Sequence, residues 1–219
     1  MNDHDKIDFY LHSIMCLVGG FLGAYALFNR GGNLGSAQTA NLISIVFCLL
    51  GNNLEEFTIR LVGLFLYFLG IELYVHLSHK ESFNIKRYGI VVNMVGIIVL
   101  SFIPSTSDPV IGLLPLFFMM STQWSIFHGT CGYNSSTIFS TNNFRQLSLA
   151  IGEYLHQKDD KHIAKAKFFA NSLFWYHLGV AISFICCLYL GTLACLLCFI
   201  PTFIAFIITL KSANTHSLT

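Results

Sequence analysis

Long stretches without a charged side chain are the feature that most restricts how this sequence folds. Residues 9–29, 88–107 and 168–210 contain no Asp, Glu, Lys or Arg. A helix needs about 20 apolar residues to cross the hydrocarbon core of a bilayer. Only 11% of the chain is charged and 54% is hydrophobic, so a soluble domain would lack the charge to cover its surface. The sequence therefore predicts an integral membrane protein and excludes soluble enzymes.

Six segments have the length and apolarity expected of membrane spans, and we predict an all-α, polytopic membrane protein. The predicted spans are residues 10–28, 57–77, 88–102, 110–127, 168–190 and 192–210. The last charge-free run is divided near Gly191, because a single helix of that length would exceed the thickness of a membrane.

Two shorter segments lie between these spans. Residues 37–50 are apolar, but a helix of that length reaches only about 21 Å, which is typical of a re-entrant or half-crossing helix. Residues 140–157 place apolar side chains at helical spacing among charged ones, which predicts an amphipathic helix.

Lys and Arg concentrate at one set of span ends, and this bias predicts the orientation in the membrane. With six spans and cytoplasmic termini, only Arg30 and Arg60 lie outside. The cytoplasmic set is Lys6, Lys80, Lys86, Arg87, Arg145, Lys158, Lys161, Lys165, Lys167 and Lys211. A seven-span arrangement in which residues 37–50 cross completely gives the same ten-to-two bias, so charge counting leaves six and seven spans open.

The two short segments begin with similar sequences, which indicates an internal repeat. Thr39 and Asn41 precede Thr141 and Asn143 by 102 positions, and a Gly/Ser-rich loop comes before each pair. The single membrane domain, residues 1–219, thus divides into repeats of about residues 9–104 and 109–211. If both short helices are re-entrant, each repeat has three spans, and the two repeats cross the membrane in opposite directions.

Paired broken helices of inverted repeats carry the solute sites of many transporters. We therefore expect a central substrate site at the tips of the two short helices, formed by Gln38, Thr39, Asn41, Thr141, Asn142 and Asn143. The alternative is that these Thr and Asn side chains only cap the helix ends.

Two ionisable residues inside predicted spans are candidates for proton coupling. Glu72 lies near the cytoplasmic end of its span, and His177 lies near the midplane of another. Ionisable groups within membranes often mark ion or proton paths. The alternatives are a Glu72 carboxylate that extends to the interface and a His177 imidazole that only packs.

Other chemistries lack a motif. Cys195 and Cys198 form a CxxC pair inside an apolar run without a second ligand pair, so we expect no metal site and no cofactor. The net charge is +1 and no basic patch is present, so we expect no nucleic-acid partner.

Three motifs resemble those of the YoaK family of small bacterial integral membrane proteins. They are residues 19–25 (GGFLGAY), 38–42 (QTANL) and 140–143 (STNN). Gly23 stands where many members have Asp, and Ala40 stands where many have Gly. The resemblance implies a multi-pass protein of the bacterial inner membrane and leaves its function open, because the family is uncharacterised.

We interpret the sequence as a transporter or channel-like carrier for a small polar solute, and not as an enzyme. Its expected partners are this solute and the lipid bilayer, and a chain of 219 residues is also compatible with a homodimer. Two rival interpretations stay open: a membrane-embedded enzyme that acts on a lipid-type substrate, and a non-catalytic assembly or sensor subunit.

The side of each terminus distinguishes six from seven spans. We expect both termini to be cytoplasmic, because six crossings return the chain to the side on which it began. Accessible tags at each end, compared in intact and permeabilised cells, measure this directly. Termini on opposite sides would mean that residues 37–50 cross the bilayer, and the two repeats would no longer be inverted.

Overall fold

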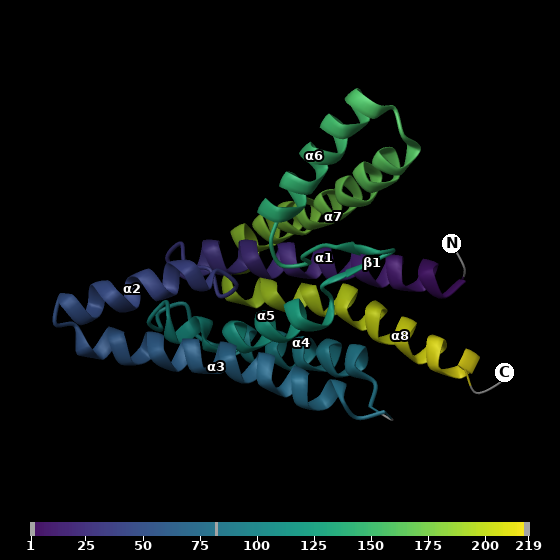
Figure 1. Ribbon diagram of the computed structural model, residues 1–219. Helices are drawn as coiled ribbons and strands as arrows, with labels where there is room; N and C mark the ends of the chain where they lie inside the picture. Colours follow the sequence, from purple (N-terminus) through teal and green to yellow (C-terminus); the bar gives the residue numbers. More distant parts are fainter. Residues whose placement is uncertain (1–2, 82, 217–219) are drawn as a thin grey trace.

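A computed structural model describes residues 3–81 and 83–216, and most of this part of the chain is helical. The helices are α1 (Asp3–Asn29), α2 (Gln38–Leu50), α3 (Leu54–Ser78), α4 (Ile85–Phe102), α5 (Leu114–Ile126), α6 (Thr141–Gln157), α7 (Asp160–Leu190) and α8 (Phe199–His216) (Figure 1). Two 3-10 segments, η1 (Ile111–Leu113) and η2 (Gly191–Cys198), lead into α5 and α8. The eight segments that were expected to be helical are thus helical.

Four stretches of the described chain are long and apolar enough to cross a membrane: Asp5–Asn29, Leu54–Ser78, Ile85–Phe102 and Asp160–Leu210. The last stretch has 51 residues and turns back at Gly191, whose φ of +56° is a left-handed conformation. It therefore supplies two helices, α7 and α8. The segment Ile111–Ile126 extends only about 24 Å as a helix, so six complete spans stay a prediction.

A small hairpin interrupts the all-α architecture that the sequence predicted. Strands β1 (Gly129–Thr130) and β2 (Tyr133–Asn134) pair antiparallel between α5 and α6. Cys131 and Gly132 form the turn with φ values of +55° and +79°, as a tight two-residue hairpin requires. Strands of two residues are too short to show an alternating hydrophobic pattern, so this hairpin could not be predicted from the sequence.

The outer surface of the helices is apolar. Phe47 of α2, Phe102 of α4 and Tyr189 of α7 expose 69%, 71% and 82% of their surface. Soluble monomers rarely expose large continuous apolar patches, whereas lipid covers them in a membrane. This surface fits a protein that passes through a membrane several times.

The long helices pack in parallel pairs that join distant parts of the chain. Phe9 of α1 contacts Phe168 of α7, with ring centroids 6.3 Å apart, and Phe28 of α1 contacts Phe184 of α7 at 5.9 Å. Both contacts follow the same order along the two helices, so α1 and α7 run in the same direction.

Helices α3 and α5 form a second parallel pair. Gly63 lies against Phe117, and Gly70 lies against Ser121 one turn further along α5. Helix α5 is antiparallel to α1, because the Gln123 amide, near the end of α5, donates to the carbonyl of Met15, in the first half of α1. Helices α1 and α3 therefore run in opposite directions although α2 lies between them.

The remaining two helices complete this alternation. Lys86, at the start of α4, forms a 2.6 Å ion pair with Asp8 near the start of α1, so these helices are parallel. Arg87 of α4 donates to the carbonyl of Thr209 near the end of α8, so those two are antiparallel. Helices α1, α4 and α7 run one way and α3, α5 and α8 run the other. The two termini lie toward the same end of the molecule (Figure 1).

The α1–α7 crossing depends on glycine. A Cβ atom on Gly20 would collide with the Tyr176 carbonyl, and one on Gly179 would collide with the Leu17 carbonyl. Small residues of this kind allow the backbones of membrane helices to approach closely. The absence of side chains at these two positions thus fixes the distance between α1 and α7.

Replacing Gly179 with Ala tests this crossing. We expect a loss of about 1–3 kcal/mol in the free energy of unfolding, because the new methyl group forces the backbones apart. Thermal unfolding of the protein in detergent measures the loss as a lower Tm. Gly152→Ala is the matched control: no atom lies within 4 Å of a Cβ at Gly152, so its Tm should not fall. Equal Tm values for the two variants would contradict the packing argument.

Candidate functional site

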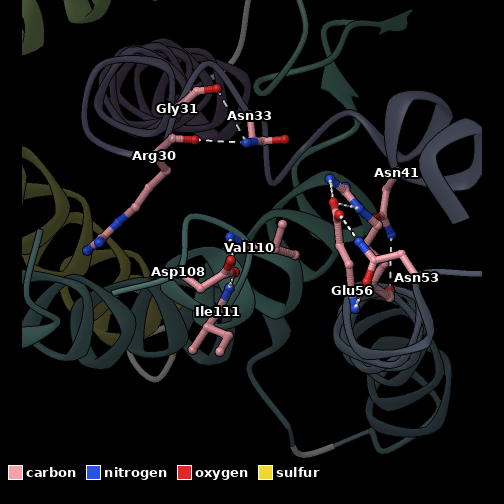
Figure 2. A network of polar contacts seen from close by, with 10 residues as sticks. Arg30, Gly31, Asn33, Asn41, Asn53, Glu56, Asp108, Val110 and Ile111 are labelled. Atoms are coloured by element: carbon pink, nitrogen blue, oxygen red, sulfur yellow. Dashed lines mark hydrogen bonds and ion pairs between the residues drawn. The ribbon is translucent and has the colours of Figure 1, made fainter. Parts of the chain in front are cut away.

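The Gly/Ser-rich loop before α2 ends in a network of polar contacts. The side-chain amide of Asn41 donates to Gln38 Oε1 at 3.2 Å and to the Arg60 carbonyl at 3.3 Å. Arg60 in turn donates to Asn41 Oδ1 and forms a 2.6 Å ion pair with Glu56. Figure 2 shows Asn41 beside Glu56 and Asn53, at the start of α3. The network attaches the start of α2 to α3.

A cavity of about 100 Å³ opens beside this network. Its polar lining comes from Asn33, Asn41, Ser44 and Arg60, and its apolar lining includes Leu113 and Phe117 at the start of α5. Helix α2 begins without a side-chain cap. The positive end of its helix dipole, at Gln38, therefore lies next to the cavity without a capping oxygen. We call this the α2 cavity.

The loop before α6 is organised around Asn143, which is fully buried. Its Oδ1 accepts hydrogen bonds from the Ser135 hydroxyl and the Ser136 amide, and its Nδ2 donates to the carbonyls of Ser136 and Phe139. These four bonds fix both the side-chain amide and the loop. Ser135 also contacts His12 of α1 and Ser172 of α7 at 3.1 and 3.3 Å. The loop is thereby attached to two other helices.

A second cavity, of about 330 Å³, lies against this loop. It is lined by Trp124, His128, Asn134, Ser135, Ser136, Phe139 and Asn142. Amide, hydroxyl, imidazole and indole groups lie among the apolar surface of this lining, so the cavity can both donate and accept hydrogen bonds. We call it the α6 cavity.

The two cavities lie at opposite ends of α5. Leu113 and Phe117 border the α2 cavity, whereas Trp124 and His128 border the α6 cavity. Between them the helix is sealed, since Met120, Ser121, Thr122 and Gln123 are fully buried. The 13 residues of α5 extend about 20 Å, so the cavities do not connect directly.

Gln123 holds the seal together. Its Oε1 accepts from Asn93 of α4 at 2.7 Å, and its Nε2 donates to the Met15 carbonyl of α1 and to Thr137 Oγ1. Two buried polar atoms in this region, Asn93 Oδ1 and Thr122 Oγ1, have no hydrogen-bond partner among the described residues. Unpaired polar atoms in a native interior are uncommon and call for an explanation.

The predicted substrate residues divide between the two sites. Asn41 lines the α2 cavity and Asn142 lines the α6 cavity, but Asn143 is enclosed in the loop. Thr39 and Thr141 are exposed. Figure 1 shows α2 and α6 extending toward different ends of the molecule. This structure thus places the two motifs in separate cavities and not in one shared site.

The capping alternative also fails for these residues. Neither α2 nor α6 begins with a side-chain cap: Ala37 and Ser140 occupy the N-cap positions and accept no side-chain cap bond. The Thr and Asn residues lie inside the first turn, one position or more beyond the cap. Asn41 and Asn143 contact loop and neighbouring-helix groups, which only the tertiary fold brings into range.

Both predicted proton-coupling residues lie on the outer surface. Glu72 and His177 are exposed on α3 and α7, and neither lines one of the cavities described above. Among the described residues, the hydrogen-bond partner of the His177 ring is the Leu173 carbonyl of its own helix. Helical periodicity alone does not show which face of an all-apolar helix points inward, so the directions of Glu72 and His177 could not be predicted from the sequence.

His12 and Arg60 are the site residues that sequence reasoning missed. His12, within the first span, is 2% exposed and contacts Ser135 in the loop before α6. An ionisable residue inside a span was the available signal for His12. The charge bias predicts only that Arg60 lies outside the cytoplasm. Its contact with Asn41 depends on the packing of α2 against α3.

The described residues contain no group of three His, Cys, Asp or Glu side chains placed to hold a metal ion. Cys195 and Cys198 are buried as free thiols in η2. Their surroundings are those of packed apolar side chains.

Comparison with known proteins gives a family and no closer relative. No curated protein and no solved structure matches the chain. Residues 11–209, which overlap every span-length helix and include the lining of the α2 and α6 cavities, match the family described as "Protein of unknown function (DUF1275)". The chain is therefore a member of the DUF1275 family, whose function is not established.

Proposed function

We propose that this protein is a membrane transporter for a small polar solute, which passes between the α2 cavity and the α6 cavity. The observation that carries the proposal is a pair of cavities at opposite ends of α5, each with hydrogen-bonding groups in a largely apolar wall, separated by the sealed segment around Gln123. A transporter that alternates between two open states needs one opening on each side and a closed barrier between them.

The inverted repeat is the second part of the proposal, and the helix directions support it. The pairs α1 and α5, α3 and α7, and α4 and α8 each combine helices of opposite direction. The packing is also reciprocal: α1 packs along α7 of the other half, as α5 packs along α3. Equivalent loop positions behave alike, since Gly35 meets Leu116 of α5 and Thr137 meets Gly19 of α1.

The membrane arrangement follows from the same directions. Six crossings with re-entrant α2 and α6 account for antiparallel α1 and α3 and for termini at one end. The Lys-rich end at Lys86 is then cytoplasmic, with the α6 cavity open to it and the α2 cavity open to the outside. A bacterial inner membrane location rests on the resemblance to the YoaK family.

The cavity linings indicate the class of solute. Arg60 is paired with Glu56, and the other polar groups are amides and hydroxyls. Such a lining fits a neutral or zwitterionic solute that exchanges hydrogen bonds as it moves. The unpaired Asn93 Oδ1 and Thr122 Oγ1 lie in the barrier, where they offer acceptor positions to a solute in transit.

One contact favours a membrane-embedded enzyme as the second candidate. His12 Nε2 lies 3.1 Å from Ser135 Oγ at the edge of the α6 cavity. However, His12 Nδ1 has no hydrogen-bond partner among the described residues, so no third group orients the imidazole as a base. Covalent labelling of Ser135 by a fluorophosphonate probe would favour the enzyme.

The first experiment measures the side on which each cavity opens. In a Cys131→Ser background, which removes an exposed native thiol, Ala40→Cys places one thiol in the α2 cavity and Asn142→Cys places one in the α6 cavity. We expect a membrane-impermeant maleimide to label Ala40→Cys in intact cells and Asn142→Cys only in inside-out vesicles. Labelling of both from the same side would contradict the two-sided arrangement.

The second experiment measures flux. Purified protein in liposomes should take up at least one of radiolabelled glycine, urea and glycerol faster than empty liposomes do. We expect Ser44→Ala and Asn142→Ala to lower this uptake by about two- to tenfold, the effect of one lost hydrogen bond. Both side chains line cavities and hold no loop in place.

Thr58→Ala and Ser148→Ala are the matched controls, because these exposed hydroxyls bond only to carbonyls of their own helices. Their uptake should equal that of the wild-type protein. Uptake no faster than in empty liposomes for all three solutes would reject the transporter proposal.

A further inference from the structure

His12 is a buried histidine with one unused ring nitrogen. It is 2% exposed, and Phe168 stacks on its ring with centroids 5.6 Å apart. Nε2 lies 3.1 Å from Ser135 Oγ and 3.4 Å from Ser172 Oγ, whereas Nδ1 has no partner among the described residues. Leaving a buried polar atom unpaired is costly and uncommon in native interiors, so this nitrogen calls for an explanation.

The hydroxyl hydrogens around the ring determine its tautomer. Ser135 donates its hydrogen to Asn143 Oδ1, an oxygen that can only accept and that the Ser136 amide holds in place. Ser172 donates to the Phe168 carbonyl. Whether Ser135 donates to Asn143 or to Ser172, its oxygen is left as an acceptor toward His12, and so is that of Ser172. We therefore assign the ring hydrogen to Nε2, which leaves a lone pair on Nδ1.

A small chamber has His12 in its lining. It has a volume of about 20 Å³, and its lining includes Asp8, Lys86 and Thr130 as well as His12. A cavity needs about 10–15 Å³ to hold one water molecule, so the chamber accommodates a single water beside the ring. The Asp8–Lys86 ion pair borders this chamber at the end of the molecule where α1 and α4 begin.

The imidazole thus lies between the chamber and the α6 cavity. Ser135, the hydrogen-bond partner of His12, also lines the α6 cavity. The titratable groups near His12 are Asp8 and Lys86 at the chamber and His128 at the α6 cavity. The α7 side chains in contact with the imidazole, the Phe168 ring and the Ser172 hydroxyl, carry no charge. The Asp8 carboxylate favours a protonated ring, whereas the charges of Lys86 and of protonated His128 oppose it.

We propose that His12 takes up and releases the coupling proton of the transport cycle, an inference that rests on the proposed function. Water in the chamber delivers a proton to Nδ1, and the resulting imidazolium keeps its Nε2–H bond to Ser135. After the halves have moved, release of the Nδ1 proton to water on the opposite side of the membrane restores the neutral ring, so each cycle carries one proton across. Because Ser135 borders the α6 cavity, the charge on His12 is sensed at the wall of the solute site.

The test separates solute exchange from proton-driven accumulation. Liposomes that contain the wild-type protein or the variant receive whichever of glycine, urea and glycerol the wild-type protein transports. We expect His12→Gln to retain counterflow exchange at equal pH, because the Gln amide still donates to Ser135. Uphill accumulation driven by an imposed pH gradient should fall to the level of empty liposomes. His177→Gln, a variant of an exposed histidine on the same transmembrane bundle, should behave as the wild-type protein does in both assays.

The outcomes distinguish this inference from the proposed function. If the wild-type protein exchanges none of the probes, the proposed function fails. If it exchanges a probe and His12→Gln still accumulates it, or if His177→Gln alone loses accumulation, the role of His12 is overturned. A loss of both activities with an unchanged Tm would also overturn it, since His12 would then be needed for solute passage itself.

A second readout uses the wild-type protein and no solute. Nitrogen-15 spectra of ring-labelled histidine in nanodiscs, assigned by comparison with His12→Gln, report which ring nitrogen of His12 carries the hydrogen. We expect the Nε2–H tautomer at neutral pH. An Nδ1–H tautomer would overturn the proposal, because Nδ1 would then be unable to accept a proton.

Discussion

The direct backbone contact between α1 and α7 sets the geometry on which the loop before α6 depends. Lipid tails are as apolar as the helices, so the hydrophobic effect alone does not bring membrane helices together. Close packing holds α1 and α7 together at Gly20 and Gly179, where even a methyl group would collide with a carbonyl of the other helix. At this separation the loop before α6 rests on α1, with the Thr137 carbonyl over Gly19. A wider crossing would move Ser135 away from His12.

Polar groups in the interior impose a second constraint, because no water in the hydrocarbon core can satisfy them. Gln123 meets it by joining α5 to α1, to α4 and to the loop before α6 in one network. Arg30 meets it differently: its guanidinium donates to the carbonyls of Ile103 and Pro104, which follow α4 and have no helical partner. These contacts tie the same helices together that enclose the two cavities.

The arrangement of the short helices is compatible with the proposed transport cycle, in which the two halves of the proposed inverted repeat move relative to one another. Helix α2 packs on α3 and α6 packs on α7, each within its own half. Their preceding loops rest instead on α5 and α1, which belong to the opposite halves. A rocking motion between the halves would therefore open one cavity as it closes the other. His12 lies on α1 at such a contact, so its protonation state can depend on the position of the loop.

The sequence by itself determined the membrane class, the helical segments, the break at Gly191 and the similarity of the two short segments. These follow from local properties: runs without charge, the length of a crossing, and matched Thr and Asn at a fixed offset. Only the tertiary structure decided which side chains meet, because His12 and Ser135 are 123 positions apart and no local pattern links them. It also decided direction, since an apolar helix has no polar face to show that Glu72 and His177 point outward. The hairpin at Cys131 likewise could not be predicted from the sequence, because four strand residues show no periodic pattern.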